Sequence, residues 1–156
     1  GRLVEAVRGK LLFLVRRPSE TIRSLMSMSM KEGWSEYAKV ENAVDYYCRR
    51  LNTLVEISKR MEVDRLIIDS NQLIEDTSHV LNRMTEWLGL KQPLVEKFQV
   101  FSKTGISGYG DPSENILKGE IRVTEGHPEI DVPAHLLSRA ESAYRFCRES
   151  FAGQWV

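Results

Sequence analysis

The sequence predicts an α/β protein with a parallel sheet, and two apolar runs carry this prediction. Residues 11–15 read LLFLV, an uninterrupted apolar run. Such runs are typical of strands buried on both faces, as in parallel sheets. A second short run lies in DRLIID (64–69), and segments of helical periodicity separate the two. Strands that alternate with helices favour parallel pairing through crossover connections.

Composition limits the classes of function. The chain has 156 residues, enough for one domain with a sizeable core. Basic and acidic residues number 22 each, and this balance argues against nucleic acid or a membrane surface as a partner. No apolar run is long enough to span a membrane. Cys48 and Cys147 lack the spacing of metal ligands, so we expect reduced thiols, no metal site and a cytoplasmic location.

The first half of the chain predicts three helical segments around the first strand. Residues 3–8 resemble the tail of a helix that stops at Gly9. After the strand, Pro18 suits the first turn of a helix. The apolar face of that helix comprises Ile22, Leu25, Met26 and Met30. A long helix is expected over 35–61, with an apolar side made by Tyr37, Val40, Val44, Tyr47, Cys48, Leu51, Leu54 and Val55.

The second half predicts a strand, a capped helix, a long loop and a final helix. Asp76 and Thr77 can cap a helix that ends at Gly89. Its buried stripe is expected to comprise Val80, Leu81, Met84, Trp87 and Leu88. Residues 101–133 are rich in Gly, Pro, Asp and Ser and should be mostly loop. The last helix is expected over 134–151, facing inward with Leu136, Leu137, Ala140, Tyr144, Cys147 and Phe151.

Two strands alone do not make a stable doubly wound sheet. We therefore expect further strands, either from an N-terminal half outside this sequence or from a partner chain, including a second copy in a homo-oligomer.

Arg16 and Arg17 follow the first strand, at the end where open α/β sheets bind ligands. The helix behind them points its positive end the same way, and Ser24 lies two turns further on. Arginine, a hydroxyl and a helix N-terminus together can bind a phosphate group. The alternative is two surface arginines, one of them paired with Glu20.

A second candidate lies in the segment SKTGISGYGD (102–111). Lys103 and Thr104 precede two glycines in a G-x-x-G pattern, Gly105 and Gly108. Glycines allow backbone N–H groups to approach an anion, and the lysine adds a charge. The alternative is an ordinary flexible loop.

These stretches, in this order, resemble the sulfotransferases that use 3′-phosphoadenosine 5′-phosphosulfate (PAPS), in particular bacterial members. RRPSETIRS carries Arg16, Pro18 and Ser24 in the family's positions. The later strand leads into SNQL (70–73) and a helix ending WLGL (87–90), where the family has a Tyr-Glu-Asp-Leu-like turn and Phe-Leu-Gly-Leu. KTGISG (103–108) is similar to the family's closing loop, and GYGDPSENILKGEI (108–121) looks like the C-terminal loop of bacterial members.

The resemblance implies that residues 1–156 are the C-terminal portion of one P-loop-type, three-layer α/β domain. Arg16 and Ser24 would hold the 3′-phosphate of PAPS, and Lys103, Thr104 and Gly105 would close over it. The reaction would move a sulfuryl group to a hydroxyl or amine of a small-molecule acceptor, without a metal. The chain departs from the family at Ser70, where an aromatic residue is common, and at Lys103, where arginine is usual.

The resemblance assigns no catalytic base. The family's phosphate-binding loop and base precede the matching stretch, and residues 1–156 contain no P-loop-like run. His79, His127 and His135 are interpreted as surface or loop residues. Two other functions stay open from the sequence: a P-loop kinase-like nucleotide-binding half, and a non-enzymatic helical domain that docks through residues 35–61.

Overall fold

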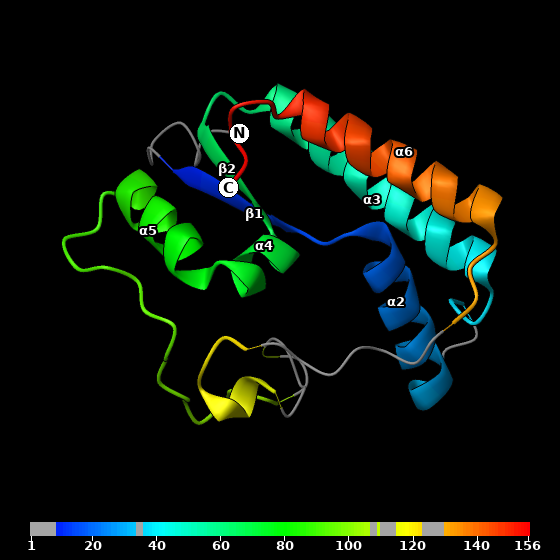
Figure 1. Ribbon diagram of the computed structural model, residues 1–156, viewed down its shortest axis with the longest axis horizontal. Helices are drawn as coiled ribbons and strands as arrows, with labels where there is room; N and C mark the ends of the chain where they lie inside the picture. Colours follow the sequence, from blue (N-terminus) through cyan, green and yellow to red (C-terminus); the bar gives the residue numbers. More distant parts are fainter. Residues whose placement is uncertain (1–8, 34–35, 107–108, 110–114, 123–129) are drawn as a thin grey trace. The chain divides into compact units, whose positions relative to one another are not determined.

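The computed structural model describes residues 9–33, 36–106, 109, 115–122 and 130–156 (Figure 1). The helix tail expected at 3–8 therefore lies outside the described residues. The chain divides into two compact units, and the second is inserted into the first. The first unit comprises 1–70 and 126–156, and the second comprises 71–125.

The sheet of the first unit has two strands, β1 (Lys10–Val15) and β2 (Asp64–Asp69), paired in parallel as predicted. Their register sets Val15 opposite Asp69, so both strands reach their carboxyl ends together. The C-terminal residues extend this sheet on the other side of β2. Ile67 N–H donates to the Gln154 carbonyl oxygen at 2.8 Å, and Val156 N–H donates to the Ile67 carbonyl oxygen at 3.0 Å. β2 therefore has a parallel neighbour on both edges, which the sequence did not predict.

Three helices accompany the sheet in the first unit: α2 (Pro18–Glu32), α3 (Val40–Arg60) and α6 (Ala134–Ser150). Pro18 occupies the first turn of α2, and the helix ends at Gly33, whose φ of 71° suits a residue without Cβ. α3 and α6 lie side by side, as Figure 1 shows. The buried core joins β1, β2 and these helices through Val15, Ile22, Met26, Ala43, Val44, Tyr47, Leu51, Val55, Ile67, Leu136, Ala140, Cys147 and Phe151.

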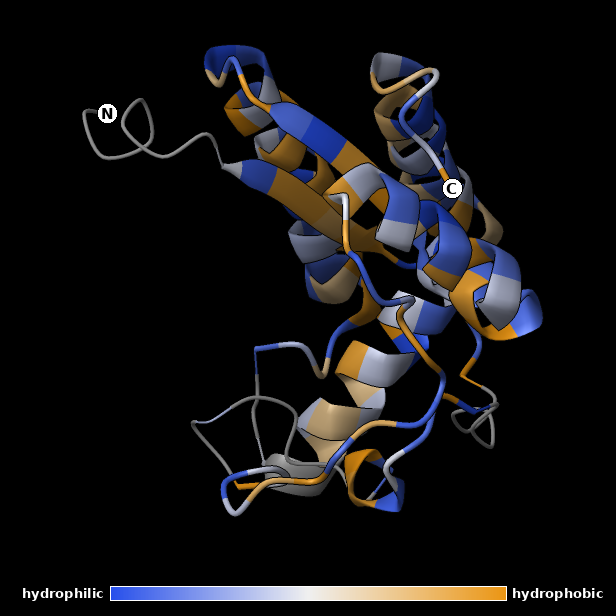
Figure 2. Ribbon diagram, turned by 90° about the vertical axis from the view of Figure 1, so that its left-hand side faces the viewer, coloured by the Kyte–Doolittle hydropathy of each residue, from blue (hydrophilic) through white to orange (hydrophobic). Residues whose placement is uncertain are grey.

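The prediction that β1 is buried on both faces is wrong within the described part of the chain. Figure 2 shows β1 as a nearly continuous hydrophobic ribbon. Only alternate residues are covered, however, because Leu12 is 41% exposed and Leu14 is 59% exposed. In β2, by contrast, Leu66, Ile67 and Ile68 are all buried. The apolar run correctly predicted a strand with apolar residues on both faces. It did not show whether other parts of the protein cover both faces.

Two helix predictions also need correction. The long helix begins at Val40 rather than near residue 35, because Lys39 before it has extended backbone. Tyr37 precedes the helix and packs against Tyr46 with the rings tilted by 56° and their centroids 5.1 Å apart. In α2, Met30 was expected on the apolar face but is exposed.

The second unit contains α5 (Thr77–Leu88), a short 3-10 turn η1 (Ile116–Lys118) and most of α4 (Ser70–Glu75). Asp76 caps α5 as predicted, accepting a hydrogen bond from His79 N–H at 3.4 Å. The expected stripe on α5 is buried only at Val80 and Leu81, and Leu88 is exposed. The long loop is held by backbone pairing of Lys97 with Glu120.

The arrangement is thus a mixed α/β fold with a parallel sheet. None of the described helices combines the length and the apolar character that crossing a membrane requires.

Candidate functional site

The carboxyl ends of β1 and β2 bring three charged side chains to one edge of the sheet. Arg16 and Arg17 follow Val15 directly, and Asp69 ends β2 opposite Val15. This position was predicted for the two arginines, because the carboxyl ends of parallel strands meet at one edge. Asp69 was not predicted as a partner. Its signal in the sequence is a carboxylate placed directly after three buried apolar residues.

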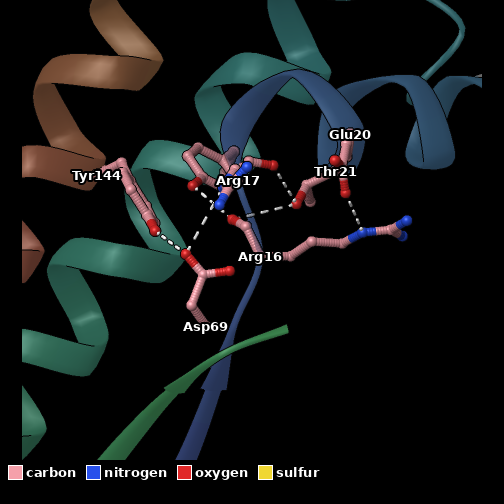
Figure 3. Close-up of polar contacts among 7 residues, drawn as sticks. Arg16, Arg17, Glu20, Thr21, Asp69 and Tyr144 are labelled. Atoms are coloured by element: carbon pink, nitrogen blue, oxygen red, sulfur yellow. Dashed lines mark hydrogen bonds and ion pairs between the residues drawn. The ribbon is translucent and has the colours of Figure 1, made fainter. Parts of the chain in front are cut away.

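Arg17 points toward the buried carboxylate of Asp69 (Figure 3). Its Nε lies 3.8 Å from Asp69 Oδ2, and the Asp69 side chain is only 8% exposed. The hydroxyl of Tyr144, on α6, donates to the same oxygen. We call these three residues the Asp69 cluster. Burial raises the pKa of the Tyr144 phenol, and the hydrogen bond to Asp69 adds to the rise, so the hydroxyl stays protonated and donates.

The Asp69 cluster joins three elements that are distant in sequence. Arg17 is the N-cap residue of α2, Asp69 ends β2, and Tyr144 lies in the middle of α6. A buried carboxylate is stable only when charged or hydrogen-bonded partners replace its water, and the arginine and the phenol do so here. The cluster therefore fixes where α2 begins relative to the sheet.

Arg16 points away from the cluster, toward Glu20 in the first turn of α2 (Figure 3). Its Nε donates to Glu20 Oε2 at 3.2 Å, and both side chains are 37% exposed. The ion pair with Glu20 that the sequence left open is therefore present. It occupies one edge of the guanidinium, and the terminal nitrogens of Arg16 make no hydrogen bond to any described residue. Those two nitrogens are the ones that form a fork on a phosphate or sulfate group.

The backbone of Arg16 is held independently of its side chain. The carbonyl oxygen accepts a hydrogen bond from the Tyr47 hydroxyl at 2.9 Å. Tyr47 is buried on α3, and burial raises the pKa of its phenol. The sequence placed Tyr47 on the inner face of its helix, but gave no sign that its hydroxyl reaches the end of β1.

Ser24 lies one helical turn beyond Glu20 on α2, so both residues share a side of the helix. Ser24 is half-buried, and its hydroxyl makes no hydrogen bond to the residues that the structure covers. The spacing places Arg16, Glu20 and Ser24 along one side of the start of α2. Arg16 also lines a cavity against α3, and Ser24 does not line that cavity.

The predicted closing loop has defined local geometry in the second unit. Lys103 Nζ lies 4.3 Å from the centroid of the Tyr109 ring, a cation–π contact. The hydroxyl of Thr104 accepts a hydrogen bond from Phe101 N–H at 3.0 Å. Gly105 has φ +79°, and a Cβ there would lie 2.9 Å from Leu117 Cδ2. The positive φ favours glycine at 105, and a Cβ there would also require the exposed Leu117 side chain to move.

Gly108 of the G-x-x-G pattern lies outside the described residues. Arg16 and Ser24 belong to the first unit, and Lys103, Thr104 and Gly105 belong to the second. The closing of this loop over Arg16 therefore stays a prediction.

A search of the described residues for metal sites found no group of three or more His, Cys, Asp or Glu side chains that could hold an ion. The cysteines are free: Cys147 is buried and Cys48 is half-buried.

Comparisons with protein-family models, curated proteins and solved structures found no match for this chain.

Proposed function

We propose that this chain is the nucleotide-anchoring portion of a sulfotransferase. The sulfotransferase would move a sulfuryl group from PAPS to a hydroxyl or amine acceptor. The observation that supports this function best is the placement of Arg16. The residue follows a parallel strand, precedes the N-terminus of a helix, and keeps its terminal guanidinium nitrogens unbound to any described residue.

The first turn of α2 strengthens the case for an anion at this edge. The helix has no side-chain N-cap, because its N-cap residue is Arg17, whose guanidinium cannot accept a hydrogen bond from the backbone N–H groups. A helix N-terminus without a side-chain cap carries partial positive charge and suits a bound anion. The helix end thus contributes positive potential, while Arg16 offers direct hydrogen bonds.

In this proposal Arg16 and Ser24 bind the 3′-phosphate of the nucleotide from the first unit. Lys103, Thr104 and Gly105 close over the same phosphate from the second unit. Lys103 would leave the Tyr109 ring to do so, which costs about 0.5–1 kcal/mol for an exposed cation–π contact. The gain is a charge-assisted hydrogen bond, worth about 1.5–3 kcal/mol.

The chemistry that such a site serves is an in-line displacement at sulfur, helped by cations and backbone N–H groups around the moving group. The residues described above bind and orient the nucleotide. Removal of the acceptor's proton needs a base that the present sequence does not identify.

A ligand-selectivity experiment tests the proposal. Thermal unfolding of the chain is followed with adenosine 3′,5′-bisphosphate and, separately, with ATP. A rise in Tm with the bisphosphate alone supports a sulfotransferase. A rise with ATP alone supports a kinase-like site, and no rise with either overturns nucleotide anchoring and favours a helical interaction domain.

The variants for this experiment are Arg16→Gln and, as a matched control, Arg145→Gln on the exposed side of α6. Loss of Arg16 should weaken binding of the bisphosphate about tenfold or more. Loss of Arg145 should leave it unchanged. Equal effects of the two variants would mean that the nucleotide responds to overall charge rather than to this site.

A further inference from the structure

A cavity of about 330 Å³ lies between β1 and α3, entirely within the first unit. This volume falls in the range of pockets that bind small organic molecules, about 300–1,000 Å³. Its apolar walls include Phe13 from β1 and Tyr46, Tyr47, Leu51 and Leu54 from α3. Aromatic rings thus reach the cavity from both the strand and the helix.

The charged residues of the cavity are all of one sign. Arg16 from the end of β1 and Arg50 from α3 line it, and no acidic side chain is among its described lining residues. The guanidinium carbon of Arg50 lies 6.0 Å from the Tyr46 ring centroid. Arg50 makes no ion pair with any residue in the described ranges. Because Glu20 already pairs with Arg16 at 3.2 Å, Arg50 supplies most of the positive charge that favours an anion over a neutral or cationic ligand in this cavity.

We propose that this cavity binds a small aromatic anion, a ring compound that carries one sulfate, sulfonate or carboxylate group. The ring packs among Phe13, Tyr46 and Leu54, and the anion pairs with Arg50. Aromatic rings pack favourably on other rings and on aliphatic side chains, and arginine forms forked hydrogen bonds with planar oxyanions.

This site is distinct in its chemistry from the proposed nucleotide site, although the two share Arg16. Arg50 belongs to the cavity alone, so its substitution tests the aromatic-anion site without removing a proposed nucleotide contact. The inference does not rest on the proposed function. A chain that binds the aromatic anion but not adenosine 3′,5′-bisphosphate would refute only the nucleotide proposal.

The probe is 2-naphthalenesulfonate, and binding to the whole chain is measured by isothermal titration calorimetry. 2-Naphthol, which keeps the ring and lacks the permanent anion, is the ligand control. We expect Arg50→Gln to weaken binding of the sulfonate about tenfold. The matched variant Arg49→Gln changes the neighbouring residue, which does not line this cavity, and should leave binding within twofold of the wild type.

Equal binding of naphthol and the sulfonate would overturn the role of the arginines. Equal losses in the Arg49 and Arg50 variants would overturn the location. As a second measurement on the unaltered chain, amide NMR shifts should change at Phe13, Tyr46 and Arg50 when the sulfonate is added. Absence of sulfonate binding would overturn the proposal. A dimer whose interface protects these amides would show that a second copy of the chain, and not a small anion, fills the cavity.

Discussion

The hydroxyl of Tyr47 donates a hydrogen bond to the backbone carbonyl oxygen of Arg16 at 2.9 Å. The contact ties the long helix α3 to the first residue after β1. It fixes the backbone of Arg16, whose side chain then extends toward Glu20. The buried Tyr47 thus sets the position of Arg16, the residue that we propose binds the phosphate.

Tyr47→Phe should test this tie. The variant keeps the ring and leaves the Arg16 carbonyl without its shortest side-chain donor, so we expect the free energy of unfolding to fall by about 0.5–1.5 kcal/mol. Urea unfolding measures the change. Binding of adenosine 3′,5′-bisphosphate should also weaken, since Arg16 loses its backbone support. An unchanged affinity would mean that the Glu20 contact alone positions the side chain.

Substitution of Arg17 should affect stability, whereas substitution of Arg16 should affect nucleotide binding. Arg17→Gln should lower stability by about 1–2 kcal/mol, because it removes a cation that pairs with the buried Asp69 carboxylate. The expected loss of stability is modest because the Arg17 side chain is 47% exposed and solvent screens the ion pair. Arg16→Gln should weaken nucleotide binding with little loss of stability. Chemical denaturation and titration calorimetry on both variants distinguish the roles, and the reverse pattern would contradict them.

Stability should fall at alkaline pH. Burial raises the pKa of Cys147 from 9.0 to about 11, and burial also raises the pKa of Tyr47 and Tyr144 above 10.0. In the unfolded chain these groups release protons at their ordinary values, whereas the folded chain still holds them. The unfolded state therefore binds fewer protons above about pH 9, and the free energy of unfolding declines as pH rises.

Cys147→Ala distinguishes the contribution of the Cys147 thiol to the alkaline loss of stability from the contribution of the two tyrosine phenols. The variant should show a flatter decline between pH 9 and 10, with the tyrosine contribution still present above 10. Urea unfolding across this pH range gives the slopes. The same slope in both proteins would mean that the thiol is not protected by burial.

Gly105→Ala should disturb the closing loop more than a matched substitution elsewhere. Both Gly105 and Gly153 have positive φ, +79° and +81°, but only at Gly105 would a Cβ meet a neighbour, Leu117. Each alanine carries a conformational cost of about 1–2 kcal/mol, and Gly105→Ala also displaces the Leu117 side chain. Hydrogen exchange at Ile106 and Tyr109 should accelerate in this variant and not in Gly153→Ala. Unaltered exchange would show that the loop adapts.

We expect residues 1–156 alone not to catalyse sulfuryl transfer, because no segment resembles a loop for the 5′-phosphosulfate and no residue is identified as the base. The measurement is transfer of labelled sulfate from PAPS to phenols, alcohols and amines. Turnover that Arg16→Ala abolishes would refute this expectation, since it would require a complete site in this chain.

Local features of the fold could be read from the sequence. Both strands, the proline start of α2 and the Asp76 cap depend on neighbouring residues, and the structure has them where the pattern placed them. The sequence predicted too early a start for α3, because the spacing of Tyr37 from the following apolar residues fits a helix although Tyr37 lies before it.

Features that depend on contacts across the chain could not be read in this way. The Asp69 cluster requires Arg17, Asp69 and Tyr144 to meet in space. The residues around each of them in the sequence give no indication of the other two. The exposure of Leu12 and Leu14 is likewise a property of what covers the sheet, not of the apolar run. The position of Arg16 was predictable, but its hydrogen bond from Tyr47 was not.

The pairing of residues 154–156 with β2 has a consequence for how the protein folds. The sheet of the first unit joins segments that the whole second unit separates along the chain. Contacts of such sequence separation form slowly, because the chain must lose much of its freedom before they contribute stability. The last pairing should therefore form late in refolding, after α3 and the β1–β2 pair. The cost of closing a loop rises only slowly with its length, so replacing residues 71–125 with a shorter flexible linker should change the refolding rate of the first unit only modestly.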